Sequence, residues 1–403
     1  MITPDTAWRV VLEQVHPLEP TTVPLTEALG CCLAEDVRAD RDLPPADRSA
    51  MDGYAVRHAD LQQRPCVLSI TGEVAAGSPY RSRVKPGSCV RIFTGANIPP
   101  GADTVVMVEQ AEERDGSVVI NSSAAAGANI LRQGEDARKG TLLLPRGTQI
   151  GAAQIGVCAA VGRASAKVHR RPSVTVLCTG SELRAVQDQV RPHEIRNSNG
   201  PTLCAALAQG GFAGTEFLSV ADQPAALAVA LRTALERHDM VLLTGGVSVG
   251  NYDFVREAVL AVGAAILFHG LAMKPGKPTL YATVPPNRHI FGLPGNPLSA
   301  VTAFHEFALP ALRRLAGHPA ETCRPGWLLP LAEATESKAG RARYELAHLV
   351  NRESGLAVAS VPSHSSADLI SAGHADGVLV LPPEQTHFAP GELVVFRPWR
   401  LSL

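Results

Sequence analysis

Four segments in the middle of the chain combine glycine with polar or charged residues, and each follows an apolar run. They span residues 179–182, 244–250, 273–278 and 292–299. Glycine lets the backbone approach a ligand closely, and the free N–H groups of a following helix favour an anion. A single glycine-rich turn is more often a plain tight turn, so the inference depends on all four segments. Together they predict a site for negatively charged groups.

Two lysines stand out in the third segment, which reads Met273-Lys274-Pro275-Gly276-Lys277-Pro278. The prolines fix the φ angle and limit the freedom of the loop, so both ammonium groups can be preorganised toward one anion. Lysines on a loop are usually solvated, and this pair gains weight from the three neighbouring segments. We expect Lys274 and Lys277 to contact an anionic substrate.

Three carboxylates accompany these segments. Glu182 and Asp253 follow predicted strands, and Asp222 precedes a predicted helix at residues 223–237. Mg²⁺ readily bridges a carboxylate and a phosphate. For Asp222, helix capping is an equally good explanation, because the Asp-x-Pro context accounts for it fully.

Several familiar motifs are missing from the sequence. Neither G-x-x-x-x-G-K-[ST] nor G-x-G-x-x-G occurs, which argues against ATPase and dinucleotide-dependent functions. The eight cysteines contain no C-x-x-C pair, and several lie in apolar runs. We therefore expect buried free thiols rather than disulfides or a zinc site.

The elements around the four segments predict an α/β domain. Strands expected at 173–178, 214–220, 240–243 and 265–268 alternate with helices, and further strands at 278–284 and 289–293 precede a helix from Pro297 to Gly317. Near-continuous apolar strands of this kind form a doubly wound, mostly parallel sheet with helices on both faces. Ligands bind beyond the carboxyl ends of such strands, so the four segments should meet at one edge.

Short alternating segments flank this domain on both sides. We expect an extended N-terminal and linker domain with helices at 1–40 and 140–172, and a β-rich domain at 41–139. The α/β domain spans 173–324. A small C-terminal β domain at 325–403 includes a hairpin around 351–355.

Composition limits the function classes further. Lys+Arg 37 against Asp+Glu 38 leaves a net charge of −1, and aromatic residues make up 4% of the chain. Neither feature suits nucleic acid or an anionic membrane. No apolar run reaches 18 residues, and charges near the N-terminus do not suit a signal peptide. We expect a soluble, cytoplasmic protein.

Eight segments occur in order along nearly the whole chain: SAMDGYAV, RIFTGA, GEDA, CTGSEL, NSNGPTL, TGGVSVGNYDF, MKPGKP and GLPGNPLSA. Together they resemble the molybdopterin molybdenumtransferase family (MoeA type), to which the C-terminal region of gephyrin belongs. The α/β domain alone is shared with molybdopterin adenylyltransferases, whereas the flanking β domains favour the transferase. The resemblance implies that adenylylated molybdopterin and molybdate are the substrates, and that the phosphoanhydride is cleaved with Mg²⁺, releasing AMP and the molybdenum cofactor.

The resemblance also implies a homodimer, in which the α/β domain of one protomer and the N-terminal β domain of its partner form the cleft. The implied catalytic residues are Asp52, Thr94, Asp136, Glu182, Asp253, Lys274 and Lys277. The implied substrate contacts are Thr179, Gly180, Ser181, Gly245, Gly246, Ser248, Gly250, Pro294, Gly295, Asn296, Ser299, Arg341 and Ser366. Glu182, Asp222 and Asp253 are the implied metal-binding set. By its sequence alone, Asp52 in an Asp-Gly pair would be a turn former.

Some details stay open at this level. Arg343 competes with Arg341 for the same role, Ser366 is a loose match, and Gly270 stands where some members carry a lysine. Two other functions compete: a molybdopterin adenylyltransferase, and a gephyrin-like scaffold without turnover. An adenylyltransferase and the molybdoenzymes that accept the cofactor are the expected protein partners.

Overall fold

The computed structural model describes residues 1–247 and 254–400. The chain divides into two compact units. The first combines Met1–Glu35, Gly147–Gly151 and Ser165–Leu403, and the second combines Asp36–Arg146 and Ala152–Ala164. No helix in the described ranges has the length and apolar run that crossing a membrane requires. The eight cysteines are free thiols, as predicted.

The first unit contains a six-stranded sheet in the order β16, β13, β17, β21, β20, β18. In chain order its strands are β13 (Val174–Thr179), β16 (Phe217–Val220), β17 (Met240–Thr244), β18 (Ala265–His269), β20 (Leu280–Val284) and β21 (Arg288–Leu293). β20 runs antiparallel to both of its neighbours, and the other five strands share one direction. The prediction of a mostly parallel sheet is confirmed, and the reversed strand follows from the short turn between β20 and β21.

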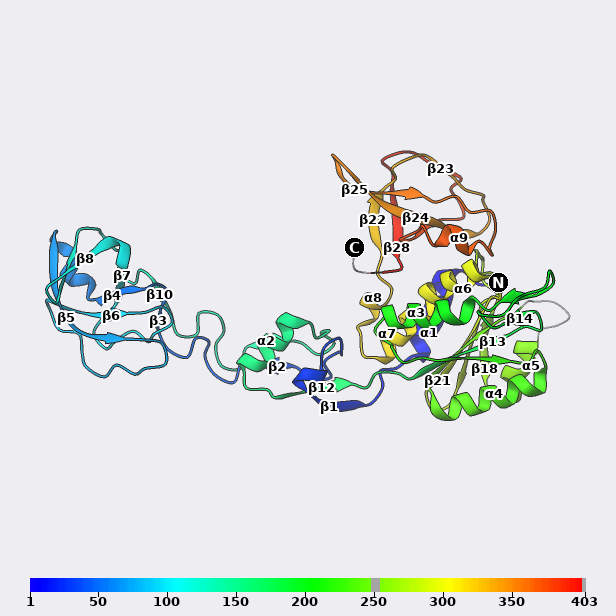
Figure 1. Ribbon diagram of the computed structural model, residues 1–403, viewed down its shortest axis with the longest axis horizontal. Helices are drawn as coiled ribbons and strands as arrows, with labels where there is room; N and C mark the ends of the chain where they lie inside the picture. Colours follow the sequence, from blue (N-terminus) through cyan, green and yellow to red (C-terminus); the bar gives the residue numbers. More distant parts are fainter. Residues whose placement is uncertain (248–253, 401–403) are drawn as a thin grey trace. The chain divides into compact units, whose positions relative to one another are not determined.

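Helices cover both faces of this sheet (Figure 1). One face packs against α1 (Pro4–Gln14), α3 (Asn199–Gln209), α6 (Pro297–Ala303) and α7 (Leu309–Leu315), and the other against α4 (Pro224–Arg237) and α5 (Phe254–Ala261). Successive side chains of a strand point to opposite faces, so Val176 joins the first core and Leu177 the second. Both side chains are fully buried.

The predicted helix from Pro297 to Gly317 is interrupted. A π-helical turn, η4 (Phe304–Ala308), separates α6 from α7. Turns of this kind shift the side-chain register within a helix. Here the turn contains Glu306, which is buried within 3.7 Å of Arg324 Nη1 and within 3.6 Å of Arg397 Nε.

The C-terminal part of the first unit forms another six-stranded sheet. Its strands are β19 (Met273–Lys274), β22 (Trp327–Pro330), β24 (Ala342–Arg352), β25 (Gly355–Ser360), β26 (Gly377–Leu381) and β28 (Leu393–Pro398). β24 and β25 form the predicted hairpin, with Arg352 paired to Gly355. β19 belongs to the lysine-bearing segment and pairs in parallel with β24, so it connects that segment directly to this sheet.

The second unit contains a six-stranded β-sheet, as expected for a β-rich region. Its strands are β4 (Gly53–Val56), β5 (Cys66–Val74), β6 (Ser88–Ile92), β7 (Thr104–Met107), β8 (Ala111–Arg114) and β9 (Ser117–Ile120). Two apolar cores lie against it, one around Tyr54 and Leu68 and the other around Ala55 and Val90. Adjacent residues of β4 thus face opposite sides.

Short elements complete both units. The first unit also contains β1 (Pro20–Pro24), η1 (Leu25–Glu27), β12 (Ser165–His169), β14 (Leu183–Arg184), β15 (Ile195–Arg196), α8 (Ala320–Cys323), β23 (Thr335–Glu336), α9 (Leu369–Ala372) and β27 (His387–Phe388). The second also contains β2 (Val37–Arg38), β3 (Arg48–Ser49), η2 (His58–Gln62), η3 (Val108–Gln110), β10 (Ile130–Leu131), β11 (Leu142–Leu144) and α2 (Ala152–Ala160).

Candidate functional site

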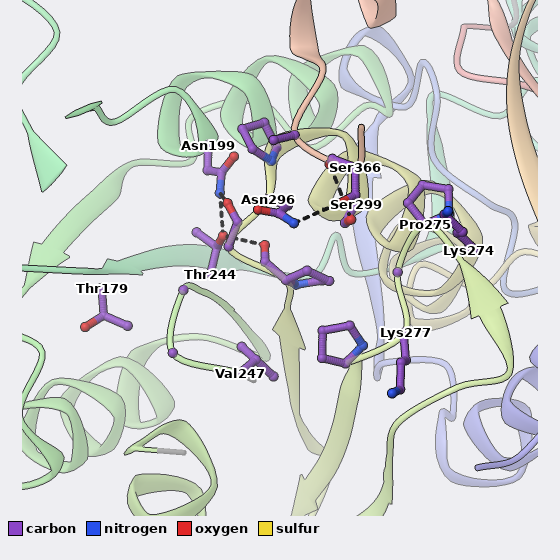
Figure 2. Close-up of a pocket in the computed structure, with 18 of the residues that line it drawn as sticks. Thr179, Asn199, Thr244, Val247, Lys274, Pro275, Lys277, Asn296, Ser299 and Ser366 are labelled. Atoms are coloured by element: carbon purple, nitrogen blue, oxygen red, sulfur yellow. Dashed lines mark hydrogen bonds between the residues drawn. The ribbon is translucent and has the colours of Figure 1, made fainter. Parts of the chain in front are cut away.

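A cavity of about 580 Å³ lies at the carboxyl ends of the parallel strands. It brings together residues from all four predicted segments and from the C-terminal sheet domain. Twelve of the predicted site residues line it: Thr179, Glu182, Gly245, Gly246, Lys274, Lys277, Pro294, Gly295, Asn296, Ser299, Arg341 and Ser366. Figure 2 shows the lysine-bearing segment on one side of the cavity and Thr179 on the other. The convergence follows from strand direction, because β13, β17, β18 and β21 all end at this edge.

The two lysines and one arginine supply the positive charge of the cavity. Lys274 and Lys277 are exposed on the segment that pairs with β24. Arg341 directly precedes β24 and lines the cavity, whereas Arg343 lines an adjoining hollow and pairs with Glu345 at 3.1 Å. Of the two arginines that the sequence left open, Arg341 is therefore the one on the cavity.

Ser366 is held at the start of α6 by three hydrogen bonds. Its carbonyl accepts from the Ser299 N–H at 3.2 Å and from the Ser299 hydroxyl at 3.4 Å, and its own hydroxyl accepts from the Asn296 amide at 2.8 Å. These contacts place Ser366 in the cavity. They also occupy the Ser299 N–H, so this amide of the first helical turn is not free for an anion as the sequence analysis expected.

Asn199 connects two of the converging segments, and sequence reasoning did not single it out. Its side-chain amide donates to Thr244 Oγ1 at 2.8 Å and to the Gly295 carbonyl at 2.9 Å, and Thr244 Oγ1 donates to the Pro294 carbonyl at 3.2 Å (Figure 2). Asn199 and Thr244 both line the cavity. The available signals were the NSNGPTL segment and the position of Thr244 directly after the strand predicted at 240–243.

Gly180, Ser181 and Asp222 lie on a neighbouring hollow of about 400 Å³ rather than on the main cavity. Asp222 does not cap α4: the N-cap residue is Gln223, with no side-chain cap bond. Instead, Asp222 Oδ1 accepts a hydrogen bond from Thr179 Oγ1 at 3.0 Å. Oδ1 also lies 3.6 Å from the position that a Cβ on Gly246 would take, so the carboxylate borders the glycine loop.

Gly245 of the cavity could not be replaced without displacing backbone. A Cβ on Gly245 would lie 1.9 Å from the Thr179 carbonyl oxygen, and the residue has a φ of +96°. Gly245 thus permits β13 and β17 to end side by side. Gly270 also has a positive φ, of +95°, which disfavours a lysine at this position.

The donors present fit a magnesium ion held together with a phosphate. The described residues contain no group of three or more His, Cys, Asp or Glu side chains that could hold a metal alone. Mg²⁺ is commonly bound through one or two carboxylates plus substrate phosphates and waters. Glu182 on the cavity suits that role, and Asp222 borders it. Asp253, Ser248 and Gly250 lie outside the described residues.

The three remaining predicted residues belong to the second unit. The Thr94 N–H and hydroxyl both donate to Asp52 Oδ1 at 2.7 Å. These two bonds hold the pKa of Asp52 below its usual value. Asp52 and Asp136 are both exposed, and Asp136 donates its N–H to the Leu43 carbonyl at 3.0 Å. Asp52 is therefore a fixed, ionised carboxylate.

The fold and the cavity define an α/β protein with a largely cationic cavity at the edge of its sheet. Among its described lining residues, Lys274, Lys277 and Arg341 are cationic and Glu182 alone is acidic. Comparison with known families extends this definition. Residues 2–162 match the "MoeA N-terminal region (domain I and II)", 175–314 the "Probable molybdopterin binding domain", and 329–399 the "MoeA C-terminal region (domain IV)".

Relatives match over nearly the full length. The chain is 33% identical over 389 residues to a Staphylococcus epidermidis protein named molybdopterin molybdenumtransferase, covering 95% of this chain and 92% of that one. A Nostoc protein of the same name is 35% identical over 386 residues, covering 93% and 87%. A solved Pyrococcus horikoshii molybdopterin biosynthesis MoeA structure matches with a TM-score of 0.84 and 27% identity, covering 99% of this chain and 100% of that one. The chain belongs to the molybdopterin molybdenumtransferase family.

Proposed function

We propose that this protein is the molybdenum insertase of molybdenum cofactor biosynthesis. It takes adenylylated molybdopterin and molybdate, cleaves the phosphoanhydride in a Mg²⁺-dependent reaction, and releases AMP and the cofactor. The observation that carries the proposal is the cavity at the sheet edge, which is lined by Lys274, Lys277 and Arg341 together with Glu182. The named activity of the full-length relatives supports the same conclusion.

Each part of the cavity has a proposed role. Lys274, Lys277 and Arg341 bind molybdate together with Ser299 and Ser366, because a dianion in a partly closed cavity needs fixed donors and positive charge. The 244–250 segment cradles the nucleotide or pyrophosphate. Glu182, with Asp222 and Asp253, orients the metal and the phosphate. Magnesium, when bound there, neutralises charge on the phosphate oxygens.

Catalysis on this proposal is positioning and electrostatic stabilisation. All eight cysteines are free thiols and none of them lines the cavity. The fixed donors hold both substrates in place, so translational freedom is lost on binding and not during the reaction. Hydrogen bonds from Thr94 lower the pKa of Asp52 and hold its carboxylate in place.

The remaining features of the proposal concern assembly. We place the enzyme in the cytoplasm as a homodimer in which Asp52, Thr94 and Asp136 of a second copy complete the site. The upstream adenylyltransferase and the molybdoenzymes that accept the cofactor are its proposed protein partners. A closed two-fold dimer is the commonest soluble assembly, and it gives two equivalent sites.

One assay separates the proposed activity from its rivals. Purified protein is incubated with adenylylated molybdopterin, molybdate and Mg²⁺, and AMP and active cofactor are measured. AMP release coupled to cofactor formation is the expected result. Consumption of ATP with molybdopterin would instead identify an adenylyltransferase. Tight binding of the substrate without turnover would identify a scaffold. Omitting Mg²⁺ or molybdate provides the matched controls.

A further inference from the structure

The second unit contains a cavity that the proposed roles leave unused. It has a volume of about 270 Å³ and is lined by Arg48, Ala76, Gly77, Ser78, Pro79, Gly95 and Asn97. Pockets that enclose whole drug-sized ligands measure roughly 300–1,000 Å³. This cavity therefore suits one charged group of a larger molecule. No acidic side chain lines it.

Backbone pairing on both sides fixes Arg48 in this cavity. β3 pairs with β10 through Leu131 and Arg48 (Figure 1). On the other side, the Ser49 N–H donates to the Ala96 carbonyl at 2.9 Å, and the Gly95 N–H donates to the Ser49 carbonyl at 2.8 Å. Ser49 is fully buried, and successive residues of a strand point to opposite sides, so Arg48 points away from the core.

The described residues do not fully satisfy the hydrogen-bonding capacity of the Arg48 guanidinium. Its Nε atom is buried and has no hydrogen-bond partner. The neighbouring carboxylate of Asp47 is already occupied, because it accepts from Arg132 Nη1 at 2.7 Å and from the Gln133 N–H at 2.8 Å. A buried polar group without a partner costs stability, and an arginine offers a planar fork of donors that matches phosphate or carboxylate.

The cavity is built on the same two segments that hold Asp52 and Thr94. Arg48 lies four residues before Asp52, and Asn97 lies three residues after Thr94. The Ser49 hydroxyl donates to the Met51 carbonyl at 2.5 Å, which shapes the turn that leads to Asp52. Asp52 in turn accepts from Thr94, so hydrogen bonds connect the two segments.

We propose that the Arg48 cavity binds a phosphate group of the pterin substrate, which makes Arg48 a substrate-binding residue of the second unit. The identity of the ligand rests on the proposed function, whereas the existence of an anion site does not. Ser78 and Asn97 add hydrogen-bonding groups beside the guanidinium. Gly77 and Gly95 both have positive φ, and Gly77 leaves open space where a side chain would stand.

The kinetic test compares two ways of blocking the cavity with matched controls. R48Q removes the charge, S78D adds a negative charge at an exposed lining position, and R81Q makes the same charge change at an exposed arginine outside the cavity. We expect R48Q and S78D to raise the KM for adenylylated molybdopterin by about tenfold or more, because charge-assisted hydrogen bonds are lost. R48K should lie between them and the wild type. R81Q should have the same KM for adenylylated molybdopterin as the wild type. In all of these variants, kcat and the KM for molybdate should not change.

A binding measurement tests the site without relying on turnover. In a K274A/K277A background, pyrophosphate affinity is measured by calorimetry with and without R48Q, and adding R48Q should weaken it about tenfold or more. Unchanged pyrophosphate affinity, or a KM change in molybdate alone, would overturn the inference. If the wild type released no AMP, the proposed function would fail, and the calorimetry would still decide whether the anion site exists.

Discussion

Lys274 illustrates how a residue can matter to substrate binding and little to the fold. Its side chain is exposed at the cavity, so its removal leaves no buried group unpaired. We expect K274A to raise the KM for molybdate by about tenfold, because a charge-assisted contact is lost. The melting temperature should stay within about 2 °C of the wild type, as for most exposed substitutions.

The control for this prediction is K338A, which removes an exposed lysine that does not line the cavity. Initial rates of AMP release at varied molybdate give the KM of each variant. An unchanged molybdate KM in K274A would remove this lysine from the binding site.

Asn199, unlike Lys274, is expected to matter to the fold as well as to the cavity, because its amide connects two loops. N199A removes the hydrogen bonds to Thr244 and Gly295 and leaves their oxygens with fewer partners. We expect N199A to destabilise the first unit by about 1–2 kcal/mol. We also expect it to lower kcat/KM, because the two loops at the cavity lose the hydrogen bonds that hold them together. Thermal unfolding and steady-state kinetics check both effects. N351A, which changes an exposed asparagine far along the chain, is the control. If N199A were as stable as N351A, the hydrogen bonds of Asn199 would contribute nothing to stability.

The sequence predicted many of the residues that meet at the cavity, but not their hydrogen bonds. Glycine turns and lysines after apolar runs carry a local signal, since strand direction alone brings them to one edge. Asn199 carries no such signal, because its partners lie 45 and 96 residues further along the chain. Asp222 shows the same limit. Its local context predicts a helix cap, whereas the folded chain offers it the Thr179 hydroxyl.

At the scale of elements, the short helix α9 controls the position of Ser366. Asp368 caps this helix by accepting from the Ser371 N–H at 3.0 Å, and it also accepts from the His364 N–H at 3.0 Å. These bonds lower the pKa of Asp368 to about 2 from its ordinary value of 3.8, and the bond from the His364 N–H has the largest effect. The carboxylate thus holds both ends of the loop that contains Ser366.

This shift predicts the pH dependence of the loop. A carboxyl group whose pKa is lower in the folded state stabilises the fold fully above its unfolded pKa and loses that effect as the pH falls through the folded value. The melting temperature of the wild type should therefore exceed that of D368N at pH 5–7, and the difference should vanish between about pH 4 and pH 2. A difference that stayed constant down to pH 2 would contradict the assigned contacts.

The π-helical turn η4 joins the α/β core to the C-terminal sheet through one buried charge. Burial raises the pKa of Glu306, and Arg397 and Arg324 oppose that effect. Removing one member of a buried ion pair commonly costs roughly 3–5 kcal/mol, because the remaining charge is left uncompensated. We expect E306A to destabilise the first unit by about that amount, measured by denaturant unfolding. E321A, at an exposed glutamate nearby in sequence, should leave the midpoint unchanged.

The sequence pattern predicted one helix from Pro297 to Gly317 and missed this turn. The apolar periodicity continues through residues 304–308, so nothing local marks the extra residue. Within the turn, Glu306 contacts two arginines from other elements, and these tertiary contacts cannot be read from the local pattern. The hairpin at 351–355 is the contrasting case, because its turn residues and flanking alternation lie within one short stretch.

At the scale of the whole molecule, composition excluded partners more easily than it identified any. A near-neutral chain poor in aromatic residues argues against nucleic acid, and the local cluster of three cations at the cavity is invisible in the net charge. The division into four domains stays a prediction, as does the assignment of Asp52, Thr94 and Asp136 to a site with residues of the α/β domain. Sequence order cannot say which copy of the chain supplies them.

Mixing two defective variants tests that assignment. In the proposed homodimer, each site takes Lys274 from one copy and Asp52 from the other. A heterodimer of K274A and D52A therefore has one site with both changes and one site with neither. Random exchange of subunits makes half of the dimers mixed, so about a quarter of the wild-type sites should be restored.

Activity is measured at limiting molybdate before and after co-refolding or subunit exchange of the two variants. Mixing K274A with E182Q is the control, because both changes then lie in the same unit and every mixed dimer keeps one defect in each site. Recovery in the K274A and D52A mixture, without recovery in the control, requires residues from two copies to act in one site. If neither mixture recovers although sedimentation shows that mixed dimers form, each site is built within a single chain.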